Sequence, residues 1–163
     1  LKNIKTKTLS LEKKYTCKLP LVLKISPDLN KNELTGVIKL VTKFNFDAII
    51  ASNTSINKTL LNDEKCQNQP GGISGKALFE HSNKTLKKIK ILRNKKVSII
   101  ASGGINNWES IGQKIYLGAT AVQIYTGLVY EGPSMIDKSL TLLSNYLKKK
   151  KIPHISKIVL DTK

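Results

Sequence analysis

Short apolar segments alternate with longer amphipathic ones along this chain, and that alternation restricts it to few folds. The apolar runs at 21–25, 48–51, 97–101 and 121–124 have the length of buried strands. Each run is followed by a stretch whose apolar residues recur at helical spacing, and the last stretch opens at Pro133. Parallel strands need crossover connections of this kind. The pattern predicts an α/β fold with four βα units, in which helices cover a parallel sheet.

The predicted helices carry signals at their ends. Asn30 and Glu33 have the spacing of an N-cap residue and its N3 partner ahead of the first helix. Asn106 or Asn107 is expected to cap the third helix. The fourth helix is predicted to bury a single apolar stripe made of Ile136, Leu140, Leu143 and Leu147.

The positions of the glycine-rich turns separate two architectures. An open doubly wound sheet usually carries its fingerprint glycines after the first strand, where this chain has the turn at 26–28. Here the glycines follow the second, third and fourth strands, at 71–75, 103–104 and 127. That distribution matches the C-terminal face of a (β/α)8 TIM barrel, where phosphates bind. Four βα units make half of such a barrel.

The strong positive charge does not by itself predict a nucleic-acid partner. The formal net charge is +17, but all except one of the 28 basic residues are lysines spread along the chain. Recognition of bases and phosphates favours the bidentate arginine side chain. Lysine together with abundant Asn and Ile is typical of an AT-rich coding sequence, so we expect no nucleic-acid partner.

Metal and membrane motifs are missing from the sequence. Cys17 and Cys66 have no cysteine or histidine at metal-ligand spacing, so no metal site is expected. No apolar run reaches the roughly 20 residues of a membrane span. Residues 1–20 also lack the apolar region of a signal peptide, and the chain as given is expected to be soluble.

Two neighbouring strand ends predict an anion site. Gly103 and Gly104 follow the third strand, and paired glycines let backbone amides approach a phosphate. Tyr125 and Thr126 add hydroxyl groups at the end of the fourth strand, so one phosphate would be shared by both turns. The alternative for the glycine pair is a tight turn without a ligand.

The loop after the second strand offers further candidates. Gly75 belongs to a run with three glycines in five residues, at 71–75, which either folds over a ligand or serves as a flexible linker. Asn53 and Thr54 can hydrogen-bond a planar heterocycle, unless Asn53 is only a turn residue. Lys24 is the one charged residue of an apolar strand. Either it has a functional role or its side chain extends to the rim of the sheet, where water solvates the ammonium.

Six motifs in order resemble the C-terminal half of a dihydroorotate dehydrogenase. They cover roughly residues 19–148 and are most similar to the quinone-dependent class 2 enzymes. The resemblance implies a flavin mononucleotide (FMN) barrel that oxidises dihydroorotate to orotate in de novo pyrimidine (UMP) biosynthesis. The motifs are LKISPDL at 23–29, SNT at 52–54, GGISGK at 71–76, IIASGGI at 99–105, LGA at 117–119 and QIYTG at 123–127.

The same resemblance implies roles for individual residues. Lys24 matches a lysine that contacts the flavin ring, where its charge would favour the anionic reduced flavin, and Ser52 matches another flavin contact. Asn53 and Thr54 match the pair that hydrogen-bonds orotate. The positions around the ribityl and phosphate groups of FMN are Gly75, Gly103, Gly104, Tyr125 and Thr126. No catalytic residue is expected within this chain, because the family's serine base lies upstream of the strand that contains Lys24.

The resemblance also predicts the organisation of the chain. We expect a poorly structured lead-in at 1–18, an FMN-binding half barrel at 19–149 and a C-terminal tail at 150–163. The chain is interpreted as a fragment whose partners would be the missing N-terminal half barrel, dihydroorotate or orotate, and a quinone. The parent enzyme is expected to be peripheral on the cytoplasmic side of a membrane.

Two other functions stay open at this point. A tRNA dihydrouridine synthase-like flavoenzyme would share the fold and the cofactor, although the motif at 52–54 and the glycine loop at 71–75 suit orotate better. A non-catalytic, degenerate half barrel would keep the fold without binding flavin. Absence of FMN from the purified protein would favour that third hypothesis.

Overall fold

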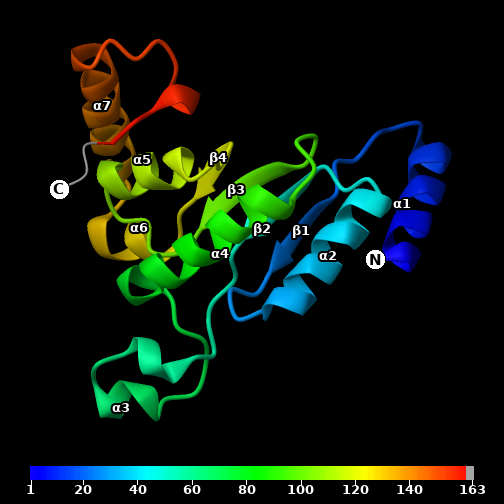
Figure 1. The fold of residues 1–163 in the computed structure, drawn as a ribbon, viewed down its shortest axis with the longest axis horizontal. Coiled ribbons are helices and arrows are strands. Elements are labelled where there is room, and N and C mark those ends of the chain that lie inside the picture. The colour runs from blue at the N-terminus through cyan, green and yellow to red at the C-terminus, as the bar shows by residue number, and fades with distance from the viewer. Residues whose placement is uncertain (161–163) are drawn as a thin grey trace.

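A four-stranded parallel sheet forms the centre of the molecule (Figure 1). The structure is a computed structural model and describes residues 1–160, so the end of the predicted C-terminal tail, 161–163, lies outside the described residues. The strands lie side by side in chain order, as half of a TIM barrel requires, and the predicted α/β fold class is confirmed. Their bounds are Val22–Ile25 for β1, Ala48–Ala51 for β2, Ser98–Ser102 for β3 and Ala121–Gln123 for β4.

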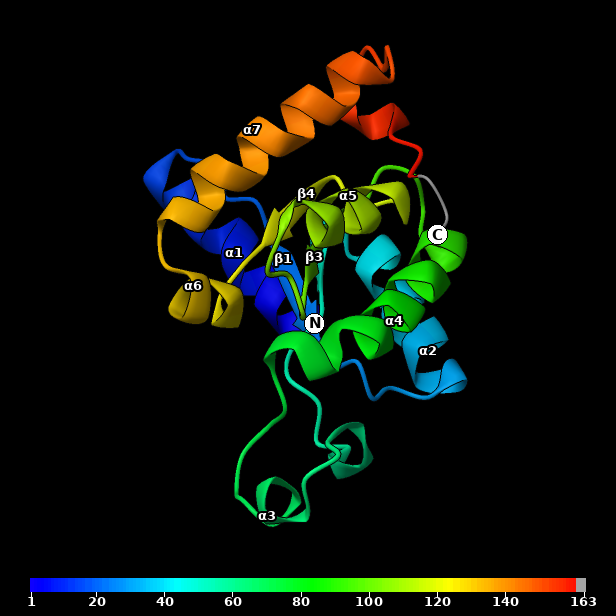
Figure 2. The ribbon, with the colours of Figure 1, turned by 90° about the vertical axis from the view of Figure 1, so that its left-hand side faces the viewer.

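Helices follow the strands as the alternating pattern predicts. Seen from the side, α2, α4 and α5 lie along one face of the sheet, while α7 crosses beyond β4 (Figure 2). A short helix, α6, separates β4 from α7. The bounds are Lys31–Lys43 for α2, Phe79–Leu92 for α4, Trp108–Tyr116 for α5, Thr126–Glu131 for α6 and Ser134–Lys149 for α7.

The two faces of the sheet differ in burial. Toward the helices, Ile49, Ile99 and Ala101 are completely buried and form the centre of the core. On the other face, Lys24 pairs in register with Ile50, and Ile50 pairs with Ile100, so these side chains share that face. Lys24 is exposed and the two isoleucines are only partly buried. In a closed barrel this second face is the interior.

The helix start signals read from the sequence are confirmed. The Asn30 side chain accepts hydrogen bonds from the backbone N–H groups of Asn32 and Glu33. The Glu33 carboxylate in turn accepts one from the Asn30 N–H. Of the two candidates for the third cap, Asn107 is the one that accepts from the Ser110 N–H. These caps fix where α2 and α5 begin and therefore the length of the loops that precede them.

The prediction of a poorly structured lead-in at 1–18 is wrong, because Lys2–Tyr15 forms the helix α1. Leu1, Thr8 and Leu11 lie at helical spacing and are at least partly buried. Only two of these three are apolar, so the stripe is too weak to stand out as a periodic signal. The lysines of α1 and Glu12 are good helix formers and favour the helix further.

The predicted apolar stripe of α7 is also wrong in part. Leu143 is buried, but Ile136 is 44% exposed and Leu140 is 58% exposed. The buried face instead contains Met135 and Ser139, one position before each of those residues. The helix is therefore rotated relative to the expected orientation, and an apolar row stays on its open side.

The segment after α7 folds back onto the helices. A short 3-10 helix, Ile155–Lys157, is followed by Ile158, which is buried. The Tyr146 hydroxyl donates a hydrogen bond to the Val159 carbonyl at 2.8 Å. The described part of the predicted tail thus packs on α5 and α7. Among residues 1–160, no helix combines the length and apolar character needed to cross a membrane.

A long excursion leaves the sheet after β2 and projects below it in Figure 1. It contains the 3-10 helix Lys58–Leu60 and the short helix α3, Glu64–Gln67. Its neck is closed by an antiparallel bridge between Ser55 and Ile73. The glycine run at 71–75 therefore returns to the sheet at a defined place and continues into the 3-10 helix Gly75–Leu78.

Candidate functional site

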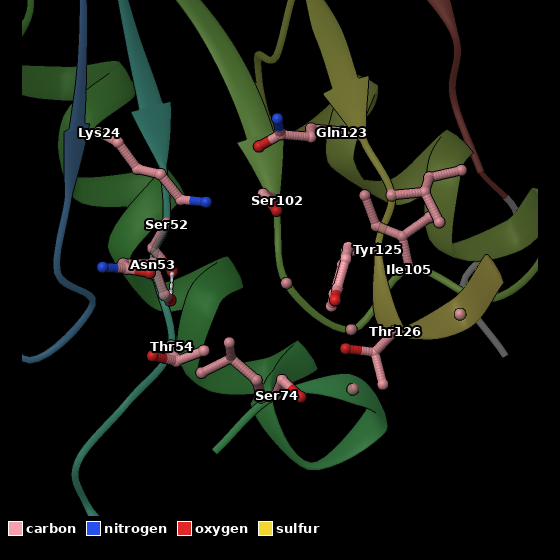
Figure 3. Close-up of a pocket in the computed structure, with 16 residues that line it drawn as sticks. Lys24, Ser52, Asn53, Thr54, Ser74, Ser102, Ile105, Gln123, Tyr125 and Thr126 are labelled. Atoms are coloured by element: carbon pink, nitrogen blue, oxygen red, sulfur yellow. Dashed lines mark hydrogen bonds between the residues drawn. The ribbon is translucent and has the colours of Figure 1, made fainter. Parts of the chain in front are cut away.

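A pocket opens at the carboxyl ends of the four strands (Figure 3). It encloses about 100 Å³, less than the roughly 300–1,000 Å³ of a site that holds a drug-sized ligand. All nine residues singled out in the sequence line it. They are Lys24, Ser52, Asn53, Thr54, Gly75, Gly103, Gly104, Tyr125 and Thr126.

The turn after β3 forms the floor of this pocket. Gly103 and Gly104 have φ angles of +106° and +76°, which lie in the region that favours glycine. A side chain at Gly104 would also collide with the backbone of Phe79 at the start of α4. The turn therefore needs glycine on two counts, and it lies directly on the first residues of α4.

Two other glycines bring the neighbouring loops close to this turn. A Cβ atom at Gly75 would lie 3.1 Å from the Thr126 methyl group, so the loop after β2 contacts the start of α6. A Cβ atom at Gly127 would collide with the Ile105 carbonyl, so α6 also contacts the segment after the β3 turn. Three loops thus converge on one small volume, as the parallel strand order requires.

The polar groups around the pocket are largely without protein partners. Within the described chain, no hydrogen bond is made by the hydroxyl groups of Thr126 and Tyr125, by the Lys24 ammonium or by the backbone N–H of Gly104. Gly104 is nevertheless buried. In Figure 3, the Lys24 ammonium and the Thr126 hydroxyl point toward the middle of the pocket. These groups are available to a ligand.

The segment after β2 lies along one edge of the pocket. Ser52 is buried, and its hydroxyl donates to the carbonyl of Asn53 at 3.0 Å, so that hydroxyl is already used within the chain. Asn53 and Thr54 are exposed. Their side chains make no hydrogen bond to residues 1–160, and the Asn53 amide points away from the middle of the pocket (Figure 3).

Asp28 ties the loop after β1 to the loop after β2. Its carboxylate accepts hydrogen bonds from the Ser55 hydroxyl at 2.6 Å and the Ile56 N–H at 2.8 Å. It also lies 2.9 Å from His81 Nε2, so the Asp28 carboxylate connects both loops to the first turn of α4. Burial is the largest influence on the Asp28 pKa and raises it, but these hydrogen bonds and the His81 charge together lower the pKa below 3.8.

Sequence reasoning missed several residues that line the pocket. Ser102 and Gln123 are Cα partners at the ends of β3 and β4, and Ser74 precedes the 3-10 helix that begins at Gly75. A signal for the first two was present, because both are polar residues at the ends of short apolar strands. Ser74 is brought in by the Ser55–Ile73 bridge, a contact that no local pattern predicts.

A phosphate group fits this arrangement. The β3 turn offers a buried, unpaired backbone N–H at Gly104, and the Thr126 hydroxyl faces the same space. The pocket has room for the phosphate end of a nucleotide, whereas a flavin ring system would extend past it toward Lys24 and the open face of the sheet. The donor set suits an anion, since no carboxylate of residues 1–160 lines the pocket.

Comparison with known proteins identifies the same scaffold. The family model described as dihydroorotate dehydrogenase matches residues 2–147. A dihydroorotate dehydrogenase (quinone) of Neisseria meningitidis serogroup B is 39% identical over 144 residues, which are 88% of this chain and 42% of that protein. One from Shewanella baltica is 40% identical over 136 residues, covering 83% and 40% of the two chains.

A solved structure agrees with these relatives. The ligand-free dihydroorotate dehydrogenase of Eimeria tenella superposes with a TM-score of 0.79 at 30% identity, over 85% of this chain and 38% of that one. The chain thus spans about two fifths of the length of the relatives it matches. With the fold, the order of the motifs and the family model in agreement, the chain belongs to the dihydroorotate dehydrogenase family.

Proposed function

We propose that this chain supplies the FMN phosphate site and part of the orotate site of a quinone-dependent dihydroorotate dehydrogenase. The observation that carries the proposal is the convergence of three glycine-bearing loops and the Lys24 ammonium on one pocket at the carboxyl ends of the strands. The matched relatives bear the name dihydroorotate dehydrogenase (quinone), which supports the same assignment.

The phosphate and ribityl groups of FMN are assigned to the lower part of the pocket. The Gly103–Gly104 turn would donate backbone N–H groups to the phosphate, and Thr126 would donate its hydroxyl. Gly75, which lines the pocket where the loop after β2 approaches α6, would contact the ribityl group. Tyr125, which is 79% exposed, would cover one side of the site.

The flavin ring is assigned to the open face of the sheet near Lys24 and Ser52. The chemistry that FMN supplies when bound is acceptance of a hydride from dihydroorotate. Lys24 would hold its ammonium beside the ring and favour negative charge there, while Asn53 and Thr54 would orient orotate through hydrogen bonds. No role as the catalytic base is assigned to a residue of this chain.

The remaining partners follow from the same assignment. Dihydroorotate and a quinone would be the substrates of the complete enzyme. The exposed inner face of the sheet and the outer edges of β1 and β4, which pair with no strand of residues 1–160, would be covered by the other half of a barrel. Peripheral membrane association would belong to that complete enzyme.

The proposal is tested by placing residues 19–149 into a complete relative. A chimera in which they replace the matching segment of the Shewanella baltica protein should purify with FMN and oxidise dihydroorotate with an added quinone. Lys24→Ala and Asn53→Ala in this chimera should lower turnover at least about tenfold, which corresponds to the loss of roughly 1.4 kcal/mol of transition-state stabilisation.

A matched control and two outcomes complete this test. Lys43→Ala changes the same charge at the far end of α2 and should leave turnover unaltered. A folded chimera that holds no FMN would contradict the proposal and favour a degenerate half barrel. A chimera that binds FMN but leaves dihydroorotate unchanged would contradict the substrate assignment alone.

A further inference from the structure

Lys114 is a charged side chain in the interior of the molecule. It lies in the middle of α5 and has no exposed surface, and it is the largest completely buried side chain among the described residues. Burial of an ammonium group is unfavourable unless other groups compensate for the lost water. Lys114 makes no direct contact in the proposed binding of FMN or orotate. The unfavourable free energy of burying its ammonium group therefore requires another explanation.

The contacts of Lys114 lead to the turn after β3. Its Nζ atom donates a hydrogen bond to the Ser82 hydroxyl oxygen at 2.6 Å and lies 5.0 Å from the centre of the Phe79 ring. The Ser82 hydroxyl is in turn 3.1 Å from the carbonyl oxygen of Gly103 and 2.8 Å from that of Phe79. Ser82 is itself completely buried. A continuous polar connection therefore runs from the buried ammonium to the glycine turn.

The packing around Ser82 makes this connection specific. A Cβ atom at Gly103 would lie 3.0 Å from the Ser82 Cβ, and one at Gly104 would collide with Phe79. The turn thus lies directly on the two residues of α4 that Lys114 contacts. Any displacement of α4 at this point would move the backbone N–H groups that face the pocket.

Resting on the proposed function, we propose that Lys114 is a positioning residue for the phosphate of FMN. Through Ser82 it holds the Gly103 carbonyl against α4, so that the next backbone N–H groups stay directed at the phosphate, and it supplies positive charge behind the turn. Burial lowers the Lys114 pKa to about 7, and the charge of Glu80 opposes that shift. A phosphate dianion bound at the turn would favour the ammonium form further.

The test compares three probes on the full 163-residue chain. FMN and riboflavin differ by the phosphate alone, and inorganic phosphate carries no ring. Wild-type protein should bind FMN more tightly than riboflavin. Lys114→Met, which keeps the side-chain length, should reduce that preference about tenfold and leave riboflavin affinity unchanged. Lys84→Met, on the exposed side of α4, is the matched control and should leave the preference unaltered.

A purely structural role predicts a different pattern. Replacing a buried, incompletely paired charge by an apolar group of similar size is often neutral or stabilising. We therefore expect Lys114→Met to unfold at the same or a higher urea concentration while it loses the preference for FMN. Loss of stability with an unchanged preference would overturn the inference. If Lys114→Met does not fold, Ser82→Ala removes the connection and should reduce the preference in the same way.

Failure of the proposed function gives a separate result. If the wild-type chain binds neither FMN nor riboflavin, the flavin assignment fails, and inorganic phosphate then decides the inference. Phosphate that raises the unfolding temperature of the wild type more than that of Lys114→Met would support the role of Lys114. An equal effect on both proteins, or none, would overturn it.

Discussion

Single residues decide the shape of the candidate site. Gly104 lies in a buried turn with φ of +76°, and its missing side chain lets the turn lie on Phe79. Gly36, by contrast, is in the interior of α2 with open space around its Cα. The backbone geometry thus requires glycine at position 104. At position 36, by contrast, glycine weakens the helix because it loses more backbone entropy on folding.

The two glycines give a matched prediction. Gly104→Ala should lower the free energy of unfolding by more than about 2 kcal/mol, because its Cβ would both collide with Phe79 and strain a positive φ. Gly36→Ala should raise the free energy of unfolding by about 0.5–1 kcal/mol. Urea unfolding measures both, and equal effects of the two substitutions would refute the described turn.

Lys114 predicts an unusual dependence of stability on pH. Its folded pKa of about 7 lies below the ordinary value of 10.5, because burial disfavours the ammonium form. Between these two values the unfolded chain binds the extra proton, so the Lys114 contribution to stability improves as pH rises from 7 toward 10.5. Below pH 7 the folded and unfolded chains both carry the ammonium form, so the Lys114 contribution no longer changes with pH.

The measurement for Lys114 is a comparison of two proteins. The difference in unfolding free energy between wild type and Lys114→Met should shift in favour of the wild type by up to about 1.4 kcal/mol for each pH unit in this range. Lys84→Met, at an exposed position, should show no such slope relative to the wild type. A pH-independent difference for Lys114→Met would mean that folded Lys114 stays protonated over this range, as it does in the unfolded chain.

Individual elements were predictable where local chemistry determines them. The α2 cap could be read from Asn30 and Glu33 because a capping box needs only residues close in sequence. The rotation of α7 could not be predicted in this way. Ile136 and Met135 are both apolar, and the contacts with α5 determine which of them is buried. The helix α1 was missed because few of its buried positions are apolar.

The capping box gives a prediction at this scale. Asn30→Ala should lower the free energy of unfolding by about 1 kcal/mol, because two backbone N–H groups at the start of α2 lose their acceptor. Asn32→Ala is the control, since its exposed side chain makes no hydrogen bond within residues 1–160. If urea unfolding showed the same loss of unfolding free energy for both variants, the hydrogen bonds of the Asn30 cap would not be the cause of that loss.

At the scale of the whole molecule, the parallel strand order brings the candidate site residues together. The turns at 71–75, 103–104 and 127 are far apart in sequence, yet adjacent parallel strands bring their ends to one edge. The sequence was sufficient to predict that convergence. The connection from Lys114 to Ser82 was not predictable, because a lysine within an amphipathic helix usually marks its solvated side.

A second basic hollow tests whether charge alone attracts the ligand. It lies between α2 and the end of α4, near the opposite ends of the strands, and Lys39, Lys43 and Arg93 border it. An anion drawn only by positive charge would choose this hollow at least as readily as the glycine turns. A ligand that needs unpaired backbone N–H groups would not.

The most direct measurement is therefore nuclear magnetic resonance of the isotope-labelled chain during addition of FMN. We expect the largest changes in backbone amide shifts at Gly75, Gly103, Gly104 and Thr126, and we expect riboflavin to change these amides far less. Changes centred on the hollow at Lys39, Lys43 and Arg93, or no change at the glycine turns, would contradict the proposed site.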